Sequence, residues 1–176
     1  MAARVHDSVL QTLALVQREV DDPRRVAALA RRQERELRAW LYPDARAEGA
    51  SLASAMDTAA AEVEELHGVP VELVRTGDVL LDERVEALVL AAREAMANAA
   101  EHSGADEVSA FVDVEDDEIA VFVRDRGSGF DAETVPPGAH GIAESIRGRM
   151  ARAGGTADIS SSAGGTEVEL RLRRSS

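Results

Sequence analysis

The sequence predicts an α+β protein in which a helical hairpin precedes a domain of mixed strands and helices. Two observations lead to this prediction. Apolar residues recur three or four positions apart through residues 5–40, which is the spacing of one helix face. From residue 69 onward, short apolar or alternating runs typical of strands separate longer stretches of helical period. A length of 176 residues fits one domain, or one domain with a small helical appendage.

Composition and charge narrow the range of functions that this chain could have. The chain is 45% hydrophobic and 30% charged, as in soluble globular proteins. Its net charge of -13, without a basic stripe, argues against nucleic acid as a direct partner. The absence of cysteine excludes disulfides and thiolate metal sites, and it suits the reducing cytoplasm. No apolar run is long enough to span a membrane, so we expect membrane contact only through a sensor region outside this sequence.

Residues 1–43 read as two helices joined by a very short loop. Asp22 suits an N-cap and Pro23 the first helical position, while Pro43 ends the second helix. Such a hairpin cannot bury its apolar stripe alone. We therefore expect a homodimer in which two hairpins form a four-helix bundle, and the stripe consists of Val5, Val9, Leu13, Val16, Val20, Val26, Leu29, Leu37 and Trp40.

Residues 44–50 lack periodicity and are predicted to be a hinge, and residues 51–176 form the second domain. Ser51 is expected to cap a helix that Gly68 closes, with Leu52, Met56, Ala59, Val63 and Leu66 on its core face. Pro70 indicates a strand start or an edge strand. The remaining elements are predicted as strands 69–74, 108–114, 119–123, 156–160 and 167–173, helices 82–103 and 142–153, a loop 127–141, and a hairpin turn 163–165.

A motif of acid and glycine follows the apolar run 119–123. In Asp125-x-Gly127-x-Gly129, the glycines let the backbone turn sharply and come close to a ligand. The carboxylate of Asp125 can accept a hydrogen bond from the exocyclic amine of a base. A plain turn at the end of a strand has the same residues, so the motif alone leaves both interpretations open.

The long helix carries a polar face. Glu94, Asn98 and the pair Glu101/His102 are three or four residues apart, on a face other than that of the apolar residues. Asparagine and carboxylate oxygens suit Mg²⁺, which binds few protein groups and keeps waters and phosphates. The alternative is a solvated helix face.

Four motifs in order resemble the N, G1, G2 and G3 boxes of the ATP-binding fold shared by gyrase, Hsp90, histidine kinases and MutL (the GHKL or Bergerat fold). This resemblance implies a two-layer α/β sandwich that binds ATP and Mg²⁺. The motifs are Glu94-Ala-Met-Ala-Asn98, Asp125-x-Gly127-x-Gly129, His140-Gly141-Ile142 and Gly165-Thr166.

A fifth motif lies near the N-terminus. His6-Asp7-Ser8-Val9-Leu10-Gln11 resembles the phosphoacceptor box of the sensor histidine kinases that include the nitrate sensors and the desaturase thermosensor. The resemblance implies that ATP phosphorylates His6 and that the group passes to an aspartate of a response regulator with a helix-turn-helix output domain. Asp7 would hold the second ring nitrogen. Gln11 would orient water for dephosphorylating the regulator.

The resemblance also implies a role for each box residue. Asn98 would bind the Mg²⁺ that bridges the phosphates, and Glu94 would orient or deprotonate a water or assist the transfer. Asp125 would bind the adenine amine. Gly127 and Gly129 would let the loop pass close to the nucleotide. Gly141 would open a helix whose N-terminal amides face the phosphates, Thr166 would close the adenine pocket, and the nucleotide site would also include His102, His140, Ile142 and Gly165.

Two residues depart from the family pattern. Glu101 stands where the family usually has a basic residue, and Ala139 where the second glycine box often has its first glycine. The acid at Glu101 repels phosphates and lowers the expected nucleotide affinity, and Arg147 and Arg149 could supply the missing positive charge. Ala139 restricts the backbone of the loop, for which Gly138 could compensate. Two alternatives therefore stand beside the kinase: a dimeric nucleotide-binding regulator without kinase activity, and an anti-sigma serine kinase, which would not need the His6 motif.

Overall fold

The computed structural model describes residues 50–129 and 137–174, with the backbone alone for residues 137–142. Contacts within the chain divide it into two compact units, Met1–Glu48 and Gly49–Ser176. The predicted helical hairpin of residues 1–43, the hinge up to residue 49, and the motif residues His6, Asp7 and Gln11 lie outside the described residues.

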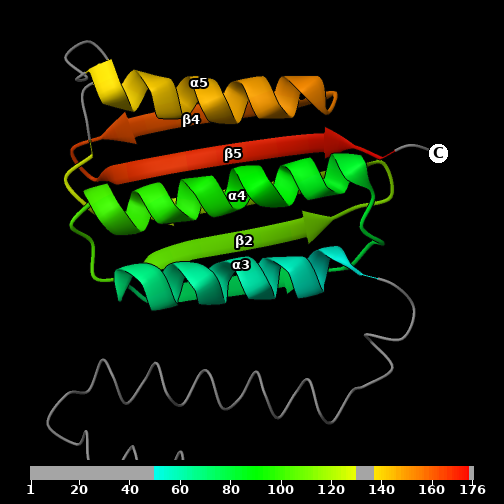
Figure 1. Cartoon of the computed structure of the whole chain (residues 1–176), viewed down its shortest axis with the longest axis horizontal. Helices are drawn as coiled ribbons and strands as arrows, with labels where there is room; N and C mark the ends of the chain where they lie inside the picture. The colour runs from blue at the N-terminus through cyan, green and yellow to red at the C-terminus, as the bar shows by residue number, and fades with distance from the viewer. Residues whose placement is uncertain (1–49, 130–136, 175–176) are drawn as a thin grey trace, which may run out of the picture. The chain divides into compact units, whose positions relative to one another are not determined.

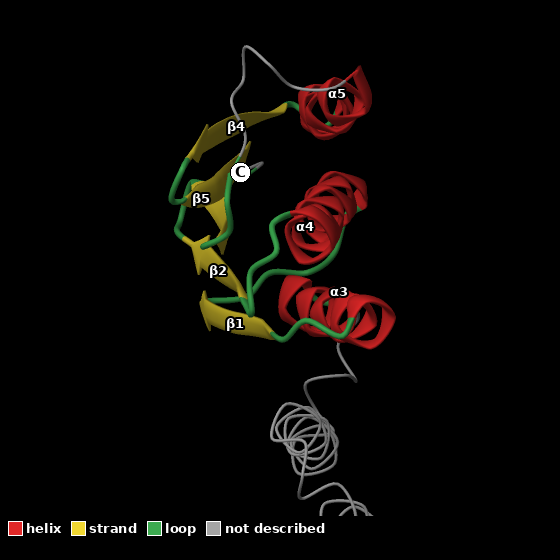
Figure 2. Ribbon diagram, turned by 90° about the vertical axis from the view of Figure 1, so that its left-hand side faces the viewer, coloured by secondary structure: helices red, strands yellow, loops and turns green. Residues whose placement is uncertain are grey.

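The second unit is a two-layer sandwich with a five-stranded sheet on one side and three helices on the other (Figures 1 and 2). The sheet has the order β1-β2-β3-β5-β4, with β1 and β2 parallel and the other pairs antiparallel. This is the mixed sheet that the ATP-binding fold requires. The elements are α3 (Leu52–His67), β1 (Val71–Thr76), α4 (Glu83–His102), β2 (Val108–Val114), β3 (Glu118–Asp125), α5 (Pro137–Arg152), β4 (Gly155–Ser162) and β5 (Gly165–Arg173).

Helix α3 begins and ends where its capping residues predict. The Ser51 hydroxyl accepts a hydrogen bond from the backbone nitrogen of Ser54, and Gly68 adopts the left-handed conformation after the last turn. Leu66, expected in the core, is 74% exposed. That prediction is wrong because Leu66 lies to one side of the apolar stripe in the last turn of the helix.

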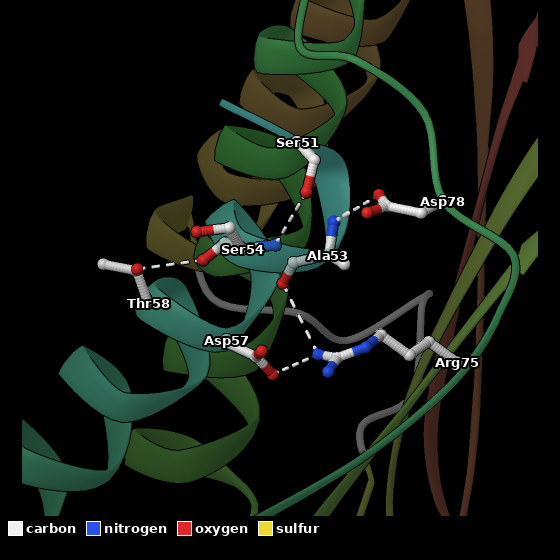
Figure 3. A network of polar contacts seen from close by, with 7 residues as sticks. All are labelled: Ser51, Ala53, Ser54, Asp57, Thr58, Arg75 and Asp78. Carbon is white, nitrogen blue, oxygen red and sulfur yellow. Dashed lines mark hydrogen bonds and ion pairs between the residues drawn. The ribbon is translucent and has the colours of Figure 1, made fainter. Parts of the chain in front are cut away.

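Polar contacts fasten the first turn of α3 to the end of β1 and the loop after it (Figure 3). The backbone nitrogen of Ala53 donates to Asp78 over 2.9 Å, and Arg75 donates to the carbonyl of Ala53 over 3.4 Å. Arg75 also forms an ion pair with Asp57. The domain therefore begins at a helix end held by both side-chain and backbone bonds.

Helix α4 crosses the middle of the sheet (Figure 1). Asp82 caps it by accepting from the nitrogen of Val85 over 2.8 Å, and Ser103 follows its last residue. The predicted core face is confirmed, since Val85, Leu88, Val89, Ala92, Met96 and Ala99 are all buried.

The predicted strands are present with shifted ends. β1 starts at Val71 rather than Val69, and Pro70 precedes it with a carbonyl that accepts from the nitrogen of Val108 over 2.9 Å. β1 lies at an edge of the sheet, as Pro70 predicts. The final hairpin is confirmed, with Ser162 paired to Gly165 across the turn.

Helix α5 begins at Pro137, five residues before the predicted start at Ile142. The prediction of a loop up to Gly141 is wrong at that end. Proline is well suited to a first helical turn, where no intrahelical partner for an N–H is needed, and this preference outweighs the glycines that follow. Ile146 and Met150, which are 1% and 0% exposed, anchor the helix on the core.

The sheet face away from the helices carries an aromatic pair. The rings of Phe111 and Phe122 are stacked with centroids 6.2 Å apart, and the guanidinium of Arg171 lies 6.0 Å from the Phe122 ring. The hydrogen bonds that Arg171 donates to the carboxylate of Glu169, and then to that of Glu118, raise the pKa of Arg171. Among the described helices, none has the length and apolar character to cross a bilayer.

Candidate active site

Asp125 is the last residue of β3 and lies on the helix-covered side of the sheet. Only 4% of its surface is exposed, and Ser51 is the other buried polar residue in the described part of the chain. Its Oδ1 atom accepts from the backbone nitrogen of Gly127 at 2.9 Å and from that of Thr166 at 3.3 Å. Two backbone donors on one oxygen orient the carboxylate before any ligand binds.

The hairpin of β4 and β5 adds two hydroxyl groups next to Asp125. Ser161 and Thr166 face each other in the register, and their hydroxyl oxygens are 2.9 Å apart. Sequence reasoning identified Thr166 but missed Ser161. Pairing residues outward from the two-residue turn Ala163-Gly164 would have found it, since Ser162 then pairs with Gly165 and Ser161 with Thr166.

Three glycines let chain segments pass in direct contact around Asp125. A Cβ on Gly127 would lie 2.0 Å from the carbonyl oxygen of Ser103, and one on Gly165 would lie 2.1 Å from that of Asp125. Gly129 has a φ of +59°, and its Cβ would lie 1.7 Å from the carbonyl oxygen of Ser162. The close approach is thus to the end of α4 and to the hairpin; the roles of Gly127 and Gly129 toward a nucleotide stay predictions.

One hydrogen bond joins the glycine turn to the long helix. The backbone nitrogen of Ser128 donates to the carbonyl of Ser103 over 3.1 Å, and so satisfies an acceptor beyond the helix end. The end of β3, the end of α4 and the β4–β5 turn therefore meet at one end of the sandwich.

The polar face of α4 extends toward the end of the sandwich at which Asp125 lies. Glu94 and Asn98 are both half-buried and one helical turn apart. Glu101 and His102, in the last turn, are exposed, with 3.9 Å between Oε2 of Glu101 and Nε2 of His102. In the described residues, no group of three or more His, Cys, Asp or Glu side chains could hold a metal ion. Binding of Mg²⁺ by Asn98 stays a prediction.

Glu94 meets an arginine on α5, the helix that begins at Pro137. Its Oε2 lies 3.3 Å from Nη2 of Arg149 on α5. Arg149, which the sequence suggested as a source of charge for phosphates, is therefore engaged with Glu94, whereas Arg147 is exposed. This pairing depends on how α4 packs against α5, which no local pattern reveals.

The second glycine box lies within α5. His140, Gly141 and Ile142 belong to the helix, so Gly141 does not open it as expected; residues from Pro137 form its first turn. The structure thus brings Asp125 together with Gly127, Gly165 and Thr166, and places Glu94 and Asn98 on one helix. The nucleotide roles of His102, His140 and Ile142 stay predictions.

Comparison with known proteins gives one family model that matches this chain. Residues 83–176, more than half of the chain, match the family model described as histidine kinase-, DNA gyrase B-, and HSP90-like ATPase. The matched segment contains the end of β3, the glycine turn, α4, α5 and the final hairpin. No curated protein matches the chain.

Solved structures of histidine kinases share the fold. The ATP-binding domain of PrrB from Mycobacterium tuberculosis is 26% identical, with a TM-score of 0.58 over 72% of this chain and 96% of that one. The histidine kinase domain of the blue-light activated kinase EL346 from Erythrobacter litoralis is 16% identical, with a TM-score of 0.57 over 97% and 94% of the two chains. The mycobacterial sensor histidine kinase MprB is 16% identical, with a TM-score of 0.54 over 70% and 95%. The chain therefore belongs to the family of histidine kinase-, DNA gyrase B- and HSP90-like ATPases.

Proposed function

We propose that this chain is the cytoplasmic catalytic core of a sensor histidine kinase. ATP phosphorylates His6, and the phosphoryl group then passes to an aspartate of a response regulator with a helix-turn-helix output domain. The observation that carries the proposal is the oriented Asp125 carboxylate, held by Gly127 and Thr166 at the same end of the sandwich as the end of α4. The His6 motif distinguishes a kinase from other ATPases of the family.

The nucleotide would be held mainly by backbone groups and a few side chains. Asp125 accepts a hydrogen bond from the adenine amine, and Thr166 borders the same pocket. Asn98 would hold Mg²⁺, which would neutralise the phosphates when bound. The first turn of α5 supplies backbone amides to the anionic end of the nucleotide.

The transfer itself uses a nitrogen nucleophile. The unprotonated ring nitrogen of His6 attacks the γ-phosphorus, the bond to the β,γ-bridging oxygen breaks, and ADP leaves with that electron pair. Asp7 holds the proton on the other ring nitrogen and so fixes the tautomer. In the second step, a carboxylate oxygen of the regulator attacks the same phosphorus and the bond to His6 breaks. Gln11 orients a water for removing the phosphoryl group from the regulator.

Glu94 orients the groups around the γ-phosphate or accepts a proton there. It is half-buried on α4, one turn before Asn98, which is where a group acting on the metal-bound phosphates would stand. Substitution of Glu94 should therefore affect turnover more than nucleotide affinity.

Incubation of the full chain with γ-labelled ATP and Mg²⁺ tests the proposal. A kinase takes up acid-labile, base-stable label. The second candidate, a dimeric nucleotide-binding regulator, is favoured by Glu101, an exposed acid in the last turn of α4 that repels phosphates. Such a regulator binds ADP and takes up no label, and an anti-sigma kinase leaves its own histidines unlabelled and labels serine on a partner.

A further inference from the structure

We propose that Arg149 is the positioning residue for Glu94, and this inference rests on the proposed kinase function. The pair joins α4 and α5, two helices between which β2 and β3 lie in the sequence. Nη2 of Arg149 lies 3.3 Å from Oε2 of Glu94, and the two side chains are 33% and 26% exposed. Partial burial limits the screening of this ion pair by solvent.

Both helices are held firmly where the pair forms. On α5, the buried side chains Ile146 and Met150 flank Arg149. On α4, Ala95 next to Glu94 is 2% exposed. The distance between the two charged groups is thus determined by rigid elements rather than by a loop.

A second contact fixes the end of α5 against the start of α4. Nε of Arg84 donates to the carbonyl of Ala153 over 2.8 Å. Arg84 precedes Glu94 along α4, whereas Ala153 follows Arg149 in the chain, just after the end of α5. The two contacts therefore mean that the helices run in opposite directions, as Figure 1 shows. Earlier turns of α5 therefore lie toward the end of α4 that follows Glu94, where Asn98 stands.

The arginine also has a feature that stability alone does not explain. Its Nε is buried and makes no hydrogen bond to any residue that the structure describes. A buried donor without a partner is unfavourable, so a smaller apolar side chain would suit this place better if packing were its purpose. Its ion pair with Glu94 is a polar contact that a role in packing alone would not need.

Through this contact, α5 affects the orientation of the Glu94 carboxylate and so the rate of phosphoryl transfer. Glu94 has three side-chain torsions, and Arg149 restricts them by holding one carboxylate oxygen. A misplaced catalytic carboxylate lowers turnover by on the order of 10- to 100-fold while leaving the binding of the adenosine moiety unchanged.

The test is a double-mutant cycle in the full chain. Arg149→Met and Glu94→Gln should each lower the rate of His6 labelling at saturating ATP by on the order of 10- to 100-fold, and the double variant should be no slower than the slower single variant. Arg149→Lys, which keeps the charge but loses the planar fork, should give an intermediate rate. Affinity for Mg-ADP, measured by calorimetry, should stay within about twofold of wild type in every variant.

Matched controls use the same residue types on the same helices. Arg152→Met on α5 and Glu86→Gln on α4 change exposed side chains and should label at the wild-type rate. If Arg149→Met labels as fast as wild type, or if the two losses multiply in the double variant, the inference is wrong. A loss of ADP affinity in Arg149→Met would assign the arginine to the phosphates and also overturn it. A wild-type chain that takes no label refutes the proposed function itself, and the inference with it.

Discussion

The Oδ1 atom of Asp125 lies 3.3 Å from the backbone nitrogen of Thr166, a residue 41 positions later in the chain. The same oxygen accepts from Gly127 at 2.9 Å. Two motifs that are separate in sequence, the acid–glycine turn and the final hairpin, are therefore one structural unit. A carboxylate that is buried and oriented in this way suits the proposed binding of an adenine amine.

The first prediction concerns Asp125. Asp125→Asn should weaken Mg-ADP binding by about tenfold or more, since the amide's donor end opposes the adenine amine and the loss of a charge-assisted hydrogen bond costs roughly 1.5–3 kcal/mol. Calorimetry measures this directly. Asp158→Asn, at an exposed acid on β4, is the matched control and should bind normally. Equal affinities for both variants would mean that Asp125 only shapes the turn.

The second prediction concerns the glycines of the site. Gly165→Ala should destabilise the domain by roughly 1–3 kcal/mol, because its φ is +120° and the new Cβ would lie 2.1 Å from the carbonyl oxygen of Asp125. In contrast, Gly148→Ala in α5 meets only a flexible arginine end at 3.4 Å and should stabilise the helix by roughly 0.5–1 kcal/mol. Urea unfolding distinguishes the two, and a Gly165 variant as stable as wild type contradicts the packing described above.

The third prediction concerns the metal. Asn98 is the chain's single asparagine, and it is half-buried on the polar face of α4. Asn98→Ala should abolish Mg²⁺-dependent labelling of the chain while its thermal midpoint stays close to that of wild type, because no core side chain is lost. Glu86→Ala, on the same helix and exposed, serves as the control and should remain active. Retained activity in Asn98→Ala would remove this residue as the metal ligand.

The fold of the second domain was largely predictable from local signals. Ser51, Asp82 and Gly68 mark helix ends in the sequence, and alternation identified β2 and β5. The start of α5 was not predictable in the same way, because the glycines near Pro137 indicate a loop unless the favourable place of proline in a first helical turn is given more weight.

The site was predictable only where a motif supplied it. Spacing and resemblance identified four candidate residues, which are Asp125, Thr166, Glu94 and Asn98. The sequence did not predict the pairing of Glu94 with Arg149, because it depends on contacts between two helices. It also did not predict the close approach of Gly127 to Ser103, because this depends on backbone distances of a few ångströms. Sequence motifs identify chemical groups, whereas their partners depend on tertiary packing.

The fourth prediction concerns assembly. The apolar stripes predicted in residues 1–43 would leave large side chains in water in a monomer, at about 1.5–3 kcal/mol for each fully exposed Val or Leu. We therefore predict that the full chain is a dimer. Deletion of residues 1–43 should give a monomer that still binds Mg-ADP and cannot label itself. Light scattering decides the point, and a full chain that is monomeric at micromolar concentration would contradict the four-helix bundle.

The most direct test of the central claim is the labelling of His6. Wild-type protein, His6→Gln and the control His67→Gln are incubated with γ-labelled ATP and Mg²⁺, and Mg-ADP affinity is measured in parallel. The account predicts acid-labile, base-stable label on wild type and on His67→Gln, no label on His6→Gln, and equal ADP affinity for all three. Label that survives in His6→Gln, or a wild-type chain that binds ADP without taking up label, would contradict it.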